Sequence, residues 1–118
     1  MEGGVKNKWY LILTRFNKIL TAIRDLAKEL FVDSKVSVYL YGSRARGEAV
    51  NSSDWDLLIV ADDGLDTENA FEKYAYPFTE IGWKLGEQIT PLFYTRSEWD
   101  AEQNTAFYIN VQNDAILL

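Results

Sequence analysis

The sequence contains no cysteine and no histidine among its 118 residues. Without cysteine there is no disulfide framework and no thiol chemistry. Without histidine there is no imidazole to serve as a general base or as the usual zinc ligand. A metal bound by this chain must therefore be held by oxygen atoms, which favours Mg²⁺ or Mn²⁺.

Basic residues are in the minority, with 12 Lys and Arg against 18 Asp and Glu and a net charge of −6. This balance argues against general nucleic-acid binding through a basic surface, and it fits a small ligand or a basic protein partner better. The first ten residues lack a signal-peptide core, and no apolar run approaches the roughly 18–20 residues that span a bilayer. We therefore expect a cytoplasmic protein without a membrane partner.

The length suits a single domain over residues 1–118, and an apolar content of 47% provides a core. Hydrophobic periodicity predicts helices over 8–30, 68–86 and 105–114, and strands over 36–41, 54–61 and 89–94. This order predicts an α/β (α+β) fold, in which helices pack on a small mixed sheet of three or more strands.

Residues 8–30 form the clearest predicted helix. Its apolar stripe comprises Trp9, Leu13, Phe16, Leu20, Ile23, Ala27 and Leu30. A stripe of this kind indicates a core-facing helix, with a coiled-coil seam as the alternative.

The two prolines limit the elements that contain them. Pro77 predicts either a kink or a second short helix that begins near it, and Pro91 predicts an edge strand or a bulge. Thr95 and Glu98 have the spacing of a capping box. The apolar end, 115–118, would either close the core of this domain or pack in an interface.

Two aspartates stand at the entrance of the predicted second strand. Asp54 and Asp56 are two residues apart, so both carboxylates point to one side, with Cα atoms roughly 6.5–7 Å apart. Such a pair can share a divalent cation. The alternative is a solvated strand entrance, because the Asp-x-Asp pattern alone is common.

A Gly-Ser turn follows the predicted first strand directly. Gly42 lets the backbone approach a ligand closely, and a helical turn after it would present N–H groups to a phosphate. Ser43 adds a hydroxyl, and Arg44 or Arg46 a charge-assisted hydrogen bond. The alternative is an ordinary turn with solvated arginines.

In combination, these features resemble the minimal nucleotidyltransferases, a branch of the DNA polymerase beta-like nucleotidyltransferase superfamily. The preceding helix and strand, and the final helix with Asn110-Val111, also resemble that family, so the likeness covers most of the chain. The matching residues of the motif are Gly42, Ser43, Arg44, Ala45, Arg46, Gly47, Ser53, Asp54, Asp56, Leu57, Leu58 and Val60.

The resemblance implies transfer of a nucleoside monophosphate, AMP from ATP, to a hydroxyl. Asp54 and Asp56 would hold two Mg²⁺ or Mn²⁺ ions, and Gly42 and Ser43 would bind the β- and γ-phosphates. Active members of the family usually carry a third carboxylate on the strand that follows the second helix. That position falls near Thr90, which is not acidic.

Glu87 is the nearest candidate for the missing carboxylate, and Asp62 or Asp63 are weaker ones. The resemblance further implies a helical HEPN protein as partner, in a toxin–antitoxin pair whose toxin is silenced by addition of AMP. A second copy of this chain is another candidate partner. The alternative function is a degenerate module that neutralises its partner by binding alone.

Overall fold

A computed structural model describes the backbone of residues 3–32 and 35–118, and the side chains of these ranges from residue 11 onward. Within this part, four strands form one mixed sheet in the order β3-β2-β1-β4. The strands are β1 Val36–Tyr41, β2 Trp55–Ala61, β3 Ile89–Thr95 and β4 Ile116–Leu117. The helical elements are α1 Gly3–Leu30, α2 Ser43–Arg46, a short π-helix η1 Phe71–Ala75, α3 Tyr76–Leu85, α4 Arg96–Asp100 and α5 Ala106–Asp114. The predicted fold class is confirmed.

The strand directions bring three chain segments to one end of the sheet. β1 runs antiparallel to β2 and to β4, whereas β2 and β3 are parallel. The end of β1 therefore meets the starts of β2 and β3, and the parallel pair needs the crossover that η1 and α3 provide. In this register Tyr41 lies opposite Asp56, and Asp56 lies opposite Thr90.

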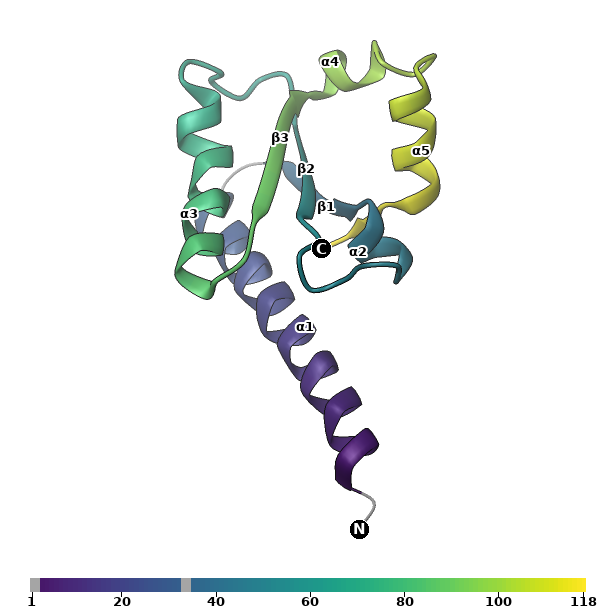
Figure 1. Ribbon diagram of the computed structural model, residues 1–118. Coiled ribbons are helices and arrows are strands. Elements are labelled where there is room, and N and C mark those ends of the chain that lie inside the picture. The colour runs from purple at the N-terminus through teal and green to yellow at the C-terminus, as the bar shows by residue number, and fades with distance from the viewer. Residues whose placement is uncertain (1–2, 33–34) are drawn as a thin grey trace.

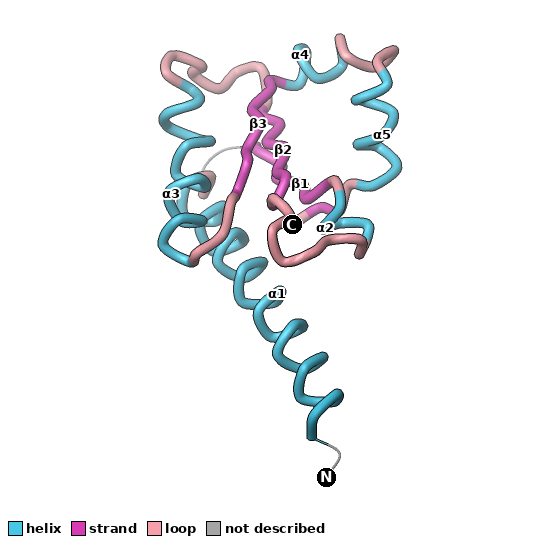
Figure 2. The backbone as a smooth tube through the Cα atoms, viewed as in Figure 1, coloured by secondary structure: helices cyan, strands magenta, loops and turns pink. Residues whose placement is uncertain are grey.

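Helices cover both faces of the sheet (Figures 1 and 2). On one face, α1 and α3 pack over a core that includes Ile23, Leu57 and Phe78. On the other face, Trp99 of α4 and Val111 of α5 pack with residues of β2. Alternation along β2 sends Trp55, Leu57 and Ile59 to the first core, and Leu58 and Val60 to the second.

Helix α1 begins at Gly3, earlier than the predicted start at residue 8, and its first half extends beyond the sheet (Figure 1). From Phe16 to Leu30 the predicted stripe packs on the core, which supports the core-facing interpretation. Leu13 belongs to the same stripe but is 58% exposed, because the sheet does not reach it. Ile19 is fully buried beside the stripe, and the side chain of Trp9 lies outside the described residues.

Both prolines lie at positions that tolerate the loss of a backbone N–H group. Pro77 falls in the first turn of α3, directly after η1, so the predicted break between two helical pieces is confirmed. Pro91 lies in β3, which is an edge strand, as predicted. The capping box of Thr95 and Glu98 is also present and opens α4.

The C-terminal residues complete the other edge of the sheet. Ile116 and Leu117 pair with β1, and the N–H of Leu118 donates to the carbonyl of Val38 at 2.9 Å. Leu118 packs against the core of this domain, as the first of the two alternatives for the apolar end requires. No helix in the described ranges is long and apolar enough to cross a membrane.

Candidate nucleotide and metal site

Gly42 and Asp56 are in direct contact at the end of the sheet. Gly42 has φ +76° and ψ −157°, a conformation that is essentially restricted to glycine. A Cβ atom added there would lie 3.3 Å from Cγ of Asp56 and closer still to its Oδ2. The cause is the register that sets Tyr41, the residue before Gly42, opposite Asp56. The structure thus brings together the two halves of the sequence motif.

Thr90 lies beside the two aspartates, on β3. Its hydroxyl donates a hydrogen bond to Oδ2 of Asp54 at 3.3 Å, and its backbone lies opposite Asp56. The position where a third carboxylate was expected is therefore at the site, and it holds a hydroxyl. Across the described residues, no three carboxylate, histidine or cysteine side chains gather closely enough to form a metal site on their own.

The environment of Asp56 is unfavourable to its own negative charge. The pKa of Asp56 is raised above its ordinary value, first by burial and then by the charge of Asp54, while Arg46 acts in the opposite direction. Burial, with Asp56 and Tyr94 nearby, raises the pKa of Tyr41 to about 12. Two carboxylates held together with too little positive charge form a donor set that suits a hard divalent cation such as Mg²⁺ or Mn²⁺. The residues present therefore fit the expected metal.

Two of the expected phosphate ligands, Ser43 and Arg46, lie on α2 directly after Gly42. Ser43 is the first residue of this short helix, where backbone N–H groups have no partner inside the helix. Arg46 is near enough to Asp56 to lower its pKa, and its Nη1 pairs with Oδ2 of Asp114 at 2.7 Å. It also pairs with Glu48, and its side chain remains 44% exposed. Arg46 is thus a partly exposed cation on the aspartate side of the site.

Arg44 and Glu87 lie on the opposite side of the sheet from Asp56. The Arg44 guanidinium stacks on the Trp55 ring, with 4.7 Å from Cζ to the ring centroid. Glu87 accepts a hydrogen bond from Nε1 of Trp55 at 2.9 Å and pairs with Arg15 of α1. Because Trp55 alternates with Asp54 and Asp56, its side chain and its partners belong to the α1 face. Glu87 was the nearest candidate for a third carboxylate at the site, but the structure does not place it beside the two aspartates.

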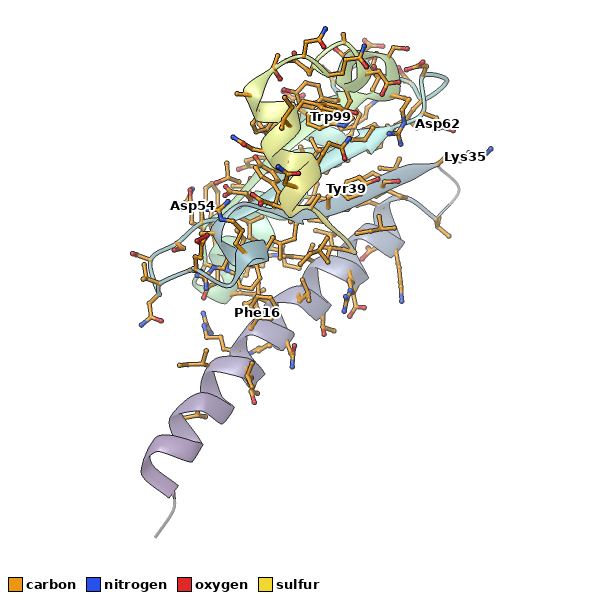
Figure 3. All side chains as sticks on the ribbon, turned by 90° about the vertical axis from the view of Figure 1, so that its right-hand side faces the viewer. Phe16, Lys35, Tyr39, Asp54, Asp62 and Trp99 are labelled. Carbon is orange, nitrogen blue, oxygen red and sulfur yellow. The ribbon has the colours of Figure 1, made fainter. Side chains whose placement is uncertain are left out.

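The two weaker candidates for a third carboxylate lie at the far end of β2. Figure 3 shows Asp62 at the end opposite Asp54. Asp63 accepts hydrogen bonds from the N–H of Ser97 at 2.9 Å and from the Ser97 hydroxyl, so it fastens the start of α4. These bonds lower the pKa of Asp63 below its ordinary value.

Sequence reasoning missed Tyr41 and Asp114 as neighbours of the site. Tyr41 directly precedes Gly42, and a correct antiparallel pairing of the first two strands would have placed it opposite Asp56. Asp114, at the end of α5, reaches the site only through Arg46. Nothing in the local sequence around Asp114 signals that contact.

The sequence model of the family described as "Nucleotidyltransferase domain" matches residues 17–117, which include the turn at Gly42, both aspartates and Thr90. A protein of Methanocaldococcus jannaschii named "Putative protein adenylyltransferase MJ1305" is 47% identical over 45 residues. That match covers 38% of this chain and 31% of the relative, so the two share about a third of the relative's length. No solved structure matches.

Replacing Gly42 by alanine should disable metal–nucleotide binding, because the new Cβ displaces the Asp56 carboxylate. Backbone strain should also lower the free energy of unfolding by about 1–3 kcal/mol. Gly47→Ala is the matched control, since Gly47 has φ +74° and open space around it. It should cost a similar free energy, about 1–2 kcal/mol, but leave binding intact. Urea unfolding and Mg²⁺–ATP-dependent thermal shifts measure the two effects, and equal binding by both variants would contradict the expectation.

Asp56→Asn should raise the melting temperature at pH 7 in the absence of divalent cations. Folding raises the pKa of Asp56, so the folded state binds its proton more tightly, and this group's contribution to stability falls as pH rises above the ordinary value of 3.8. The gap between variant and wild type should therefore close as the pH drops below that value. Asp63→Asn should do the opposite and lower the melting temperature at pH 7, because the pKa of Asp63 is lowered by folding. Thermal melts from pH 7 to below pH 3.8 measure the direction of both changes in melting temperature.

Proposed function

Because the chain belongs to the nucleotidyltransferase domain family, we propose that it transfers a nucleoside monophosphate, AMP from ATP, to a hydroxyl group on a partner protein. The observation that carries the proposal is the contact between Gly42 and the Asp56 carboxylate. It sets a phosphate-binding turn and a pair of cation ligands against each other. A metal-bound triphosphate needs both elements at once.

The chain's own residues would divide the work between cation and phosphates. Asp54 and Asp56 would hold Mg²⁺ or Mn²⁺, which supplies Lewis-acid activation and neutralises phosphate charge when bound. The backbone at Gly42 and the hydroxyl of Ser43 would bind the β- and γ-phosphates. Arg46 would exchange its exposed contacts with Glu48 and Asp114 for a phosphate oxygen, since surface ion pairs of this kind are weak.

The transfer forms one bond and breaks one bond. The acceptor oxygen attacks the α-phosphorus, the bond from this phosphorus to the bridging oxygen breaks, and pyrophosphate leaves with the electron pair. The acceptor proton must go to water or to a group of the partner, because the Thr90 hydroxyl stays protonated and serves as a donor to Asp54. Glu87 is already bound to Trp55 and Arg15, so it is not assigned the role of base.

A protein acceptor is supported by the name of the archaeal relative, which specifies a protein adenylyltransferase. The resemblance to minimal nucleotidyltransferases further suggests a HEPN-type helical protein as the acceptor, in a toxin–antitoxin pair in the cytoplasm. The net charge of −6 would favour contact with a basic surface on such a partner.

A second candidate function is a binding module that neutralises its partner without chemistry. The presence of Thr90 in the place of a third carboxylate favours this alternative. Nucleotide and metal would then bind at the same site, but no AMP would move.

Incubation with α-labelled ATP, Mg²⁺ and a co-purifying partner should pass label to that partner. Asp54→Asn and Asp56→Asn should each abolish transfer, because each removes a carboxylate of the cation site. Asp62→Asn is the control, since Asp62 lies at the far end of the same strand (Figure 3). Complex formation without any transfer of label would favour the binding module instead.

Thr90→Asp should accelerate transfer by about 100-fold, the lower range of general-base effects, because it adds a proton acceptor beside Asp54. The added negative charge should also lower the melting temperature without divalent cations, and Mg²⁺ should restore it. Thr90→Val, which removes the hydroxyl without adding charge, should leave the rate near that of the wild type. Single-turnover rates at saturating Mg²⁺ and nucleotide test this prediction, and an unchanged rate in Thr90→Asp would contradict it.

A further inference from the structure

The residues on either side of Asp54, Ser53 and Trp55, each make a side-chain contact on the face of the sheet opposite the aspartate carboxylates. On one side, Nη2 of Arg44 donates to the carbonyl of Ser53 at 2.9 Å. On the other side, the indole N–H of Trp55 donates to Glu87 at 2.9 Å, and its backbone N–H donates to the carbonyl of Gln88 at 2.8 Å. The two side-chain contacts, with Arg44 and Glu87, come from the α1 face of the sheet, away from the aspartate carboxylates.

Glu87 links these contacts into one cluster. Its side chain is only 10% exposed, and it accepts from Nη2 of Arg15 at 2.5 Å and from Nε of Arg15 at 2.9 Å, in addition to Trp55. Nη2 of Arg44 lies 3.7 Å from Oε1 of Glu87, the same oxygen that accepts from Trp55. Arg44 in turn stacks on Trp55, whose ring is also in contact with Phe16 of α1. We call Arg15, Arg44, Trp55 and Glu87 the rear cluster.

The two aspartates differ in how the sheet supports them. Asp56 lies inside β2 and is paired with Tyr41 on one side and Thr90 on the other. Asp54 precedes the strand, and strand pairing begins only at Trp55. The sheet therefore fixes Asp56 from both sides, whereas Asp54 is held by one hydrogen bond from Thr90 and by whatever holds its neighbours Ser53 and Trp55.

We propose that Arg44 and Glu87 are positioning residues, which orient the Asp54 carboxylate toward a divalent cation by holding Ser53 and Trp55 from the opposite face. This inference rests on the proposed function, since it specifies how that site is held in shape. Metal ligands must be fixed within about 0.5 Å to bind productively, and outer partners that orient ligands change metal affinity when they are removed. Arg44, which the sequence motif places next to the phosphate turn, thus acts on the cation site through the backbone.

The test compares the affinity for Mn²⁺ with α,β-methylene-ATP, measured by calorimetry, between wild type and variants. Arg44→Met keeps an apolar stem against Trp55 but removes the donor to Ser53, and Glu87→Ala removes the acceptor for the indole. Each should weaken binding by about tenfold, the lower end of outer-partner effects on metal affinity. Glu87→Gln, which can still accept from Trp55, should weaken binding less than Glu87→Ala.

A loss of stability alone must be separated from a loss of orientation. Phe31→Leu is the control, because Phe31 is a buried residue that packs on Tyr74 and Phe78, away from the rear cluster. It should lower the melting temperature without changing affinity. In an Asp54→Asn background, Arg44→Met should have little further effect on affinity, because the residue it orients is already disabled.

Three results would overturn the inference. Unchanged affinity in Arg44→Met and Glu87→Ala would remove its basis, and so would an equal loss of affinity in Phe31→Leu. Fully additive effects of Asp54→Asn and Arg44→Met would show that Arg44 acts by another route. If wild type itself binds no metal–nucleotide, the proposed function fails first, which distinguishes that outcome from the other three.

Discussion

The contact between Gly42 and the Asp56 carboxylate is the constraint on which the site depends. It exists because β1 and β2 pair antiparallel in the one register that places Tyr41 opposite Asp56. A slip of one residue would turn Asp56 to the other face of the sheet and bring Trp55 to the turn. Such a slip is costly because it would take the buried Trp55 out of the α1-side core and turn the Asp56 carboxylate into it. The core thus fixes the geometry of the site.

Alternation along β2 separates the chemistry of the site from its support. The side of the aspartates carries Arg46, whose charge acts on Asp56, and Thr90, which donates to Asp54, with Tyr41 opposite Asp56 in the sheet. The side of Trp55 carries the rear cluster, which includes a largely buried carboxylate between two arginines. Removing one member of such a cluster leaves a poorly paired charge, which is costly in a buried setting. The charges of the rear cluster therefore depend on one another.

The sequence was sufficient for most of the elements and for the motif. Apolar periodicity located the helix that packs from Phe16 to Leu30, and the restrictions on proline located the start of α3 and the edge strand β3. The short two-residue strand β4 was not predicted, because Ile116 and Leu117 are too few to show a period. Leu13 has the same spacing as its buried neighbours, yet it is exposed, since a periodic pattern does not show where the sheet ends.

The roles of individual charged residues were harder to predict. Arg44 lies within the motif and Glu87 lies just before β3, but neither position in the sequence tells which face of the sheet a long side chain reaches. Thr90 was recognised only as a position where an acid was missing, and its bond to Asp54 depends on the pairing of β2 with β3. Contacts of this kind join residues 32 to 72 positions apart, which no local pattern encodes.

The parallel pairing of β2 with β3 has a consequence for the order in which the site is built. β1 and β2 are joined by a shorter connection than β2 and β3, so the first half of the site forms from contacts between segments that are closer along the chain. Thr90 and Glu87 arrive only after the crossover through η1 and α3 has docked, and loop closure over that length is slower. We therefore expect the turn to meet Asp56 before Asp54 gains its supports. In that order of events, the chain would acquire the ability to bind a cation only late in folding.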